Sequence, residues 1–372
     1  MDATIPLPLL AGLTPQQFMK RHWQKKPLLV RGAIPGFGPV VERSALFELA
    51  GKEGVESRLV AQKGKGWQMR SGPFTRRSLP ALSQPGWTLL VQGVDLHHDG
   101  IHALLNRFRF VPDARLDDLM ISFATDTGGV GPHFDSYDVF LLQAHGQRRW
   151  RIGRQKDKTL VEGAPLKVLA NFVAEEEYLL GPGDMLYLPP GYAHDGVASG
   201  ECMTYSIGFR APSRGELARE LLQRIAEDAE EAAGTALYRD GTQDAVEAPG
   251  AIPPAMVDFA RQALEAALRE PDMIPRALGE YLTEPKPDVW FDAPSGPAVV
   301  MSVVLDRRTR MMHDDRHIFI NGESYRAAGR DATLMRRLAD TRQLSQGDLA
   351  KASEEARELL LSWLDAGWVH GF

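Results

Sequence analysis

The chain has 372 residues, 44% of them hydrophobic, and a formal net charge of −6, so two or three soluble domains are expected. A single cysteine, Cys202, excludes an intramolecular disulfide. No long apolar run predicts a membrane span and no signal peptide is recognisable, so we expect a cytoplasmic protein without a membrane partner.

The first part of the chain predicts a helix followed by strands. Thr14 and Pro15 are typical of a helix start, where Thr caps the helix and Pro occupies its first position. Trp67, Trp87 and the apolar run 89–91 then indicate strands of a sheet.

The next segment carries a possible metal motif. His133 and Asp135 are two residues apart, so on a strand both side chains point to the same face, and His194 follows much later. Two histidines and one aspartate are the ligand set of a non-haem Fe(II) site, which leaves positions open for an organic co-substrate and O2. A zinc site with the same ligands remains the alternative.

The surroundings of these ligands indicate a small β-barrel. Glycines at 128, 129 and 131 let a loop approach a metal closely before an apolar strand begins. A turn at 181–183, a short strand and a Pro-Gly corner precede His194. This arrangement is typical of a barrel of the cupin or jelly-roll kind.

Arg148 is predicted to point into that barrel. Residues 145–147 are interpreted as a hairpin turn, and 148–152 as the following strand. Arg148 shares a strand face with Trp150 and Ile152, whose apolar side chains belong inside. A buried arginine needs an anionic partner, which is either a dicarboxylate co-substrate or a carboxylate of the protein.

Several motifs together resemble a known family. They are Trp23–Val30, the His133/Asp135 pair, the distal His194 and the closing segment Ser206–Pro212. In order and spacing they resemble the JmjC-domain 2-oxoglutarate oxygenases. The resemblance is greatest to the bacterial ribosomal oxygenases that hydroxylate an arginine of large-subunit ribosomal protein sixteen.

The resemblance implies a fold and a set of cofactors. The fold is α+β: a double-stranded β-helix (the cupin or jelly-roll JmjC barrel), then a helical dimerisation region and a C-terminal winged-helix domain. The implied cofactor is Fe(II), with 2-oxoglutarate and O2 as co-substrates. No catalytic residue beyond the metal ligands is assigned, because this chemistry needs no general base at the attacked carbon.

The resemblance also implies co-substrate contacts. Arg148 would bind the distal carboxylate of 2-oxoglutarate, and Thr204 and Ser206, which share a strand face, would lie near the same molecule. Ser206 is favoured because relatives often carry Asn at the position of Thr204. An ordinary structural hydroxyl is the alternative for both residues.

Three residues beside the metal motif are candidates for binding the target arginine. Asp126, Tyr137 and Asp138 offer two carboxylates and an aromatic ring, the groups that hold a guanidinium. The alternative is that they are solvated loop or strand-edge residues.

After residue 212 the pattern becomes helical. Apolar residues recur at helical spacing from Leu217 to Ala229, and a second helix is predicted from Pro254 to Glu270. Residues 213–270 contain 6 Arg and 12 Asp or Glu. Two apolar stripes with little to cover them predict a homodimer interface, which the family also implies, and packing against the barrel of the same chain is the alternative.

The last part resembles a winged helix. We predict strands at 298–305 and 317–320, a turn at Asn321-Gly322, and helices at 332–341 and 354–366. Winged helices commonly bind DNA, but 330–372 holds 6 basic and 7 acidic residues, so no DNA partner is expected. A scaffold or protein-contact role is favoured.

These predictions divide the chain into an oxygenase domain (1–212), a helical dimerisation region (213–275) and a winged-helix-like domain (276–372). The leading functional prediction is a 2-oxoglutarate-dependent dioxygenase that hydroxylates an arginine of a ribosomal protein. A histidyl or small-molecule oxygenase and a non-catalytic cupin-type regulator are the alternatives. The choice of arginine over histidine rests on the resemblance alone.

Overall fold

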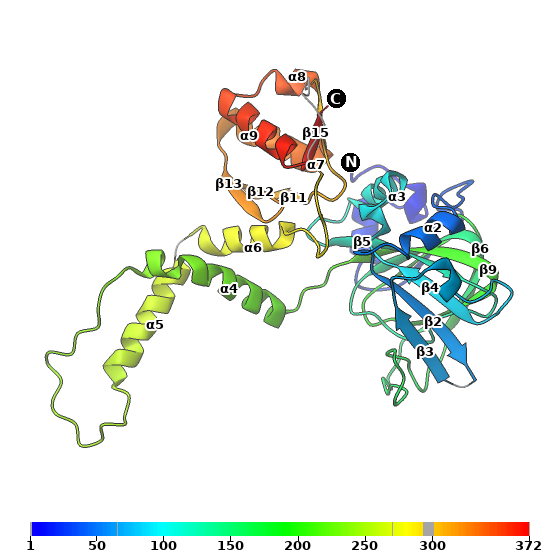
Figure 1. The fold of residues 1–372 in the computed structure, drawn as a ribbon, viewed down its shortest axis with the longest axis horizontal. Coiled ribbons are helices and arrows are strands. Elements are labelled where there is room, and N and C mark those ends of the chain that lie inside the picture. The colour runs from blue at the N-terminus through cyan, green and yellow to red at the C-terminus, as the bar shows by residue number, and fades with distance from the viewer. Residues whose placement is uncertain (1, 65, 270, 293–300, 372) are drawn as a thin grey trace. The chain divides into compact units, whose positions relative to one another are not determined.

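The computed structural model describes residues 2–64, 66–269, 271–292 and 301–371 (Figure 1). The contacts within the chain divide it into two compact units, unit 1 from Met1 to Ala211 and unit 2 from Pro212 to Phe372.

Unit 1 is built on a nine-stranded sheet with the order β1-β8-β6-β9-β5-β4-β2-β3, and β7 pairs with β6 beside this path. The paired strands are antiparallel. The strands are β1 (Leu28–Val30), β2 (Ser57–Lys63), β3 (Gly66–Ser71), β4 (Trp87–Val91), β5 (Leu116–Ala124), β6 (Val139–Gly153), β7 (Glu176–Leu180), β8 (Met185–Leu188) and β9 (Ala193–Phe209).

Short helices accompany this sheet. They are η1 (Pro8–Leu10), α1 (Pro15–Arg21), α2 (Arg43–Leu49), η2 (Arg76–Ser78), η3 (Val94–Leu96), α3 (Asp99–Leu105) and η4 (Asn106–Phe108). The predicted helix start is confirmed: the Thr14 hydroxyl accepts a hydrogen bond from the Gln17 backbone N–H, and the Gln17 side chain accepts one from the Thr14 N–H. The strands predicted around Trp67 and Trp87 are β3 and β4.

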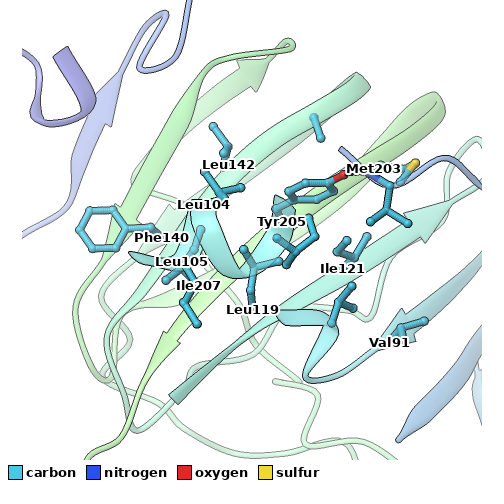
Figure 2. Close-up of a cluster of buried hydrophobic side chains, with 14 of the residues drawn as sticks. Val91, Leu104, Leu105, Leu119, Ile121, Phe140, Leu142, Met203, Tyr205 and Ile207 are labelled. Carbon is cyan, nitrogen blue, oxygen red and sulfur yellow. Dashed lines mark hydrogen bonds between the residues drawn. The ribbon is translucent and has the colours of Figure 1, made fainter. Parts of the chain in front are cut away.

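The helices cover one face of the sheet and form the main core with it. Figure 2 shows Leu104 and Leu105 of α3 among side chains of β5, β6 and β9, including Ile121, Phe140 and Ile207. All of these side chains are buried. Burying this face of β6 and β9 leaves their alternate residues to line the opposite face, where the candidate site lies.

The prediction of a hairpin turn at 145–147 is wrong. β6 runs through this segment as one strand, and its pairing with β9 shifts register between Gln143 and His145 and again between His145 and Gln147. Gly146 has φ +60, and a Cβ there would collide with the Glu201 carbonyl. An irregularity in a continuous strand, allowed by glycine, therefore replaces the predicted turn.

Unit 2 begins with helices. They are α4 (Arg214–Ala233), α5 (Pro254–Arg269) and α6 (Met273–Thr283). The first two agree with the predicted helices, except that Glu270 lies outside the described residues. The third, α6, was not predicted, and the predicted domain boundary at 275–276 falls inside it.

The rest of unit 2 contains two small sheets, with strand orders β14-β10-β15 and β11-β12-β13. The elements are β10 (Val303–Leu305), β11 (Met311–His313), β12 (His317–Ile320), β13 (Glu323–Arg326), α7 (Gly329–Thr341), β14 (Gln343–Leu344), α8 (Gln346–Leu349), α9 (Glu354–Asp365) and β15 (Val369–Gly371). The predicted strand at 317–320, its turn and both predicted helices are confirmed. Positions 298–300 of the other predicted strand lie outside the described residues.

Candidate metal and co-substrate site

The structure brings His133, Asp135 and His194 together. One ligand atom from each lies within 4.8 Å of the others. His133 precedes β6, and His194 lies near the start of β9. Each histidine backbone N–H donates to the carbonyl of the other, at 2.9 and 2.8 Å, so the two segments are fixed to one another.

Both imidazoles are oriented for metal binding. The Nδ1 of His133 lies 2.9 Å from the Gly131 carbonyl, and the Nδ1 of His194 lies 3.1 Å from the Tyr192 carbonyl. A carbonyl only accepts, so each Nδ1 carries the proton and each Nε2 keeps its lone pair. Burial, and next the nearby His133, lower the pKa of His194 to about 4, so this imidazole is neutral at pH 7, as a metal ligand must be.

The loop before His133 depends on Gly131. Its φ is +80, and a Cβ there would lie 2.9 Å from the Trp67 ring and 3.1 Å from Val168. The Gly131 carbonyl also accepts the Nδ1–H of His133. A substitution at Gly131 therefore disturbs both the backbone and the ring orientation of a ligand.

We expect Gly131→Ala to destabilise unit 1 by about 1–3 kcal/mol and to weaken divalent metal binding, because the backbone conformation and the Trp67 contact both oppose a side chain. Urea unfolding and a Co(II) titration would measure the two effects. Gly163→Ala is the matched control, because Gly163 has φ +71 with no atom within 4 Å of its Cβ position. Equal losses in the two variants would show that the Trp67 contact is unimportant.

A cavity of about 240 Å³ opens beside the three candidate ligands. It is lined by residues of β2, β4, β5, β6, β9 and the loops around them. The lining residues are Arg58, Leu90, Gln92, Met120, Ser122, Val130, His133, Phe134, Asp135, Tyr137, Val139, Leu141, Arg148, Trp150, Leu166, Lys167, His194, Thr204 and Ser206. Arg148, Thr204 and Ser206, the residues predicted to lie near a co-substrate, therefore share a cavity with the candidate metal ligands.

Arg148 is 3% exposed and forms no ion pair with a carboxylate in the part of the chain that the structure describes. Its Nη1 donates to the hydroxyls of Ser122 at 3.0 Å and Thr204 at 3.3 Å, and its Nη2 to the Gly196 carbonyl at 3.4 Å. Its Nε is buried and has no hydrogen-bond partner among the residues that the structure describes. Burial lowers the pKa of Arg148 from its ordinary value, yet a guanidinium stays charged in proteins.

This environment bears on the two partners considered for Arg148, a dicarboxylate co-substrate and a carboxylate of the protein. The alternative, an internal salt bridge, is absent among the described residues. A buried cation in a cavity with an unused N–H fits an anionic ligand, since a carboxylate would satisfy the group that the protein leaves open.

Two polar residues near Arg148, Ser122 and Gln143, were not predicted from the sequence. Ser122 lies on β5, and its hydroxyl contacts Arg148 directly. Alternation along β5 places it on the same face as Met120, so a pairing of β5 with β9 would have identified it. Gln143 lies behind Thr204, whose hydroxyl donates to the Gln143 Oε1 at 2.9 Å.

The three predicted substrate residues have different positions. Tyr137 lines the cavity and is partly exposed; burial, then Asp135 and Asp118, raise the pKa of its phenol, which stays a neutral donor. Asp126 is exposed outside this lining, and its carboxylate accepts the Gly200 backbone N–H at 2.8 Å.

The prediction for Asp138 needs correction. Its carboxylate is fully buried outside the cavity lining. It accepts hydrogen bonds from the Tyr187 hydroxyl at 2.6 Å and the Gln24 amide at 3.2 Å, and it forms an ion pair with Arg115. A carboxylate committed in this way holds the N-terminal segment against the sheet and is unavailable to a substrate guanidinium.

A second carboxylate, that of Asp118, lies on the same side of the sheet as the cavity. A Cβ at Gly208 would lie 3.5 Å from the Asp118 Oδ1. Gly208 alternates with Ser206 and Thr204 on β9, so Asp118 lies on the side of the sheet that bears the cavity, although it is not among the residues that line the cavity. Asp118 is buried, accepts the Gly93 backbone N–H at 2.9 Å, and acts electrostatically on Tyr137. Asp118 could not be identified from the sequence, because the register shift between Leu116 and Leu119 obscures which of the adjacent residues Asp117 and Asp118 faces which side of the sheet.

The fold and the site together define the class of protein. Residues 103–217 match the JmjC domain family, and residues 262–370 match the ROXA-like winged helix family. The chain is thus a JmjC-domain protein with a C-terminal winged helix, and the α+β organisation predicted from the sequence is confirmed.

Comparison with individual proteins narrows this class. The chain is 35% identical over 329 residues to the ribosomal protein uL16 3-hydroxylase of Escherichia coli, covering 85% of this chain and 86% of that protein. The crystal structure of E. coli YcfD superimposes with a TM-score of 0.85 at 30% identity, over 96% of this chain and 98% of the other. The structure of YcfD, described as a ribosomal oxygenase in complex with cobalt and 2-oxoglutarate, gives a TM-score of 0.82. The chain belongs to the JmjC-domain ribosomal oxygenase family.

Among the described residues, no helix combines the length and the apolar character needed to cross a bilayer.

Proposed function

We propose that this protein is an Fe(II)- and 2-oxoglutarate-dependent hydroxylase of a ribosomal protein, with an arginine of uL16 as the target. The observation that carries the proposal is one cavity that holds a His-Asp-His ligand set and a buried arginine with no carboxylate partner among the described residues. The similar YcfD binds cobalt, which is a divalent stand-in for iron, and 2-oxoglutarate. A ribosomal substrate would place the enzyme in the cytoplasm.

The residues present fit these groups. His133, Asp135 and His194 would hold the iron, and three ligands on one side leave positions for the co-substrate and O2. When bound, the iron would let O2 act as the oxidant while 2-oxoglutarate supplies two electrons, so that one oxygen atom enters a substrate C–H bond, the other enters succinate, and CO2 is released. Arg148 orients the co-substrate through its distal carboxylate, with Thr204 and Ser206 beside it.

The protein must also hold the target side chain. Tyr137 offers a ring and a neutral hydroxyl at the cavity, and the buried carboxylate of Asp118, which lies outside the cavity lining beside Gly208, acts electrostatically on Tyr137. We infer that these two residues grip the substrate guanidinium, so that Asp118 takes the role first predicted for Asp138. Asp126, at the exposed turn, remains a candidate for a contact with a more distant part of the substrate.

We expect Asp118→Asn to raise the KM for a uL16 peptide by about 10- to 100-fold, because a charge-assisted hydrogen bond to the guanidinium is lost. The asparagine oxygen can still accept the Gly93 N–H, so the fold is retained. Steady-state assays with varied peptide would measure the change, and the affinity for 2-oxoglutarate should be unaltered. Asp117→Asn is the neighbouring control, and an equal effect of the two would contradict the assignment.

The enzyme is also proposed to be a homodimer through the helical region predicted at 213–275. On α5, Met256, Val257, Leu264 and Leu268 are exposed although they form an apolar stripe. A second copy of the chain would cover these side chains, since an exposed apolar helix face is unfavourable in water. The predicted three-part division into 1–212, 213–275 and 276–372 stays part of this proposal, with the winged helix as a scaffold.

We expect the wild-type protein to sediment as a dimer and Leu264→Glu to sediment as a monomer, because a buried charge at an apolar interface is costly. Leu361→Glu on α9 is the control, as Leu361 is also half exposed but lies outside this region. A wild-type monomer at micromolar concentration would contradict the proposal.

The proposed activity is tested with purified protein, Fe(II), 2-oxoglutarate and peptides in air. We expect a uL16 peptide to gain one oxygen atom at an arginine, with stoichiometric succinate. Hydroxylation of histidine peptides instead would support the histidyl alternative. Absence of succinate with every peptide would favour the non-catalytic regulator.

A further inference from the structure

Gln143 is a buried side chain of β6 that does not line the cavity. Its Nε2 donates to the His145 carbonyl at 2.8 Å and lies 3.5 Å from the Gly146 carbonyl. Carbonyl oxygens only accept hydrogen bonds, so the nitrogen end of the amide must face this strand irregularity. The oxygen end therefore faces Thr204.

This orientation determines the hydroxyl proton of Thr204. The Thr204 Oγ1 lies 2.9 Å from the Gln143 Oε1, which can only accept, so the single hydroxyl proton of Thr204 is donated to Gln143. Only lone pairs of Thr204 remain for Arg148, whose Nη1 donates to them at 3.3 Å. The carbonyls of His145 and Gly146 therefore orient the Gln143 amide, and this amide in turn determines the direction of the Thr204 hydroxyl in the cavity lining.

The Ser122 hydroxyl is the second hydrogen-bond acceptor for the Arg148 Nη1. This hydroxyl donates to the Thr204 backbone carbonyl at 3.3 Å and accepts from the Arg148 Nη1 at 3.0 Å. Nη1 is therefore held by two acceptors. The opposite edge of the guanidinium, formed by Nε and Nη2, keeps an unpartnered N–H and one long bond, and this edge can bind a carboxylate through two parallel hydrogen bonds.

We propose that Gln143 is a positioning residue for the co-substrate: it orients Thr204, which with Ser122 fixes Arg148 so that its Nε–Nη2 edge receives the distal carboxylate of 2-oxoglutarate. The inference rests on the proposed function. Without Gln143 the Thr204 proton is free to turn toward Nη1, where two donors face each other and the guanidinium loses an acceptor.

Direct binding measures the effect without turnover. Calorimetric titration of 2-oxoglutarate into the full-length Co(II)-loaded protein, without oxygen, should give a Kd about tenfold higher for Gln143→Leu than for the wild type. The affinity for Co(II) should be equal in both. Gln155→Leu is the matched control, because Gln155 also binds backbone groups, those of Val173, but lies outside the cavity lining.

A double-mutant cycle separates positioning from general destabilisation. Because Gln143 acts through the Thr204 hydroxyl, Gln143→Leu should raise the Kd much less in a Thr204→Val background than in the wild type. Additive effects, or a Kd for Gln143→Leu within twofold of the wild type, would overturn the proposal.

The experiment remains decisive if Gln143→Leu does not fold. Thr204→Val breaks the same chain of hydrogen bonds, and Thr204→Ser, which keeps the hydroxyl, should restore most of the lost affinity. Equal Kd values for these two variants would overturn the proposal. A wild-type protein that binds no 2-oxoglutarate would instead refute the proposed function itself.

Discussion

Replacing Asp135 by alanine should reduce hydroxylation by more than about 100-fold and abolish tight binding of one Co(II) ion. Loss of a second-sphere partner already lowers metal affinity by about 10- to 100-fold, and Asp135 is proposed as a direct ligand that also supplies negative charge. Its side chain is partly exposed, and its Oδ2 lies 3.7 Å from the His194 Nε2, so its removal leaves the two imidazoles without the anion. Cobalt absorption spectra and succinate release would measure the two losses.

Asp157→Ala provides the control for this experiment. Asp157 is an exposed loop aspartate whose pKa is lowered to about 2 by hydrogen bonds from Thr159 and Asn171. Its removal deletes a carboxylate of the same unit without touching the cavity. If Asp135→Ala and Asp157→Ala had the same metal affinity as the wild type, the metal would have to bind elsewhere.

Replacing Arg148 by methionine should weaken 2-oxoglutarate binding by at least about 100-fold. Truncating one partner of a buried, hydrogen-bonded charge pair costs about 2–5 kcal/mol, since the other charge is left unpaired. The same variant should unfold at a higher temperature than the wild type when no ligand is present. The wild-type guanidinium is buried without a carboxylate among the described residues, and methionine removes that cost.

Thermal unfolding with and without 2-oxoglutarate tests both halves of this prediction. The unfolding temperature of the wild type should rise when 2-oxoglutarate is added. That of Arg148→Met should be higher than the wild type's without the ligand and should not change when the ligand is added. Arg151→Met is a matched control on the same strand, because Arg151 points away from the cavity and pairs with Asp195 at 2.5 Å. Equal stabilisation of Arg148→Met and the wild type would remove Arg148 from the site.

The parts of the site that could be predicted are those encoded by local spacing. The spacing of His133 and Asp135 predicted a shared site, and the structure brings both residues to His194, although they precede β6 instead of lying on a strand. Arg148 and Trp150 both line the cavity, as predicted, although the segment before them is a strand irregularity and not a turn. Side chains alternate between the two faces of the sheet within 148–152 whether a turn or a strand irregularity precedes this segment. His194 was recognisable from its turn and corner, and the resemblance supplied the rest.

The errors arise where function depends on distant partners. Asp138 lies beside the metal motif in sequence, yet its carboxylate is held by Gln24, Arg115 and Tyr187, which come from three separate segments. Conversely, Ser122 and Gln143 are single polar residues in apolar strands, and only the pairing of β5, β6 and β9 shows that they serve Arg148. Neither relation can be read from local periodicity.

The missed helix α6 has a similar explanation. Pro275 occupies the third position of α6, within the first turn. The first four backbone N–H groups of a helix have no intrahelical acceptor, so proline loses nothing there. The sequence alone did not show where that helix begins, because α5 ends only a few residues earlier.

The most direct test of the account is intact-protein mass spectrometry of large-subunit ribosomal proteins from host cells with and without this gene, grown in air. The account predicts that uL16 is lighter by one oxygen atom in the deletion strain, and that fragmentation places the missing oxygen on an arginine. Unchanged masses for every ribosomal protein, with the gene expressed in the parent strain, would contradict the assignment of a ribosomal substrate.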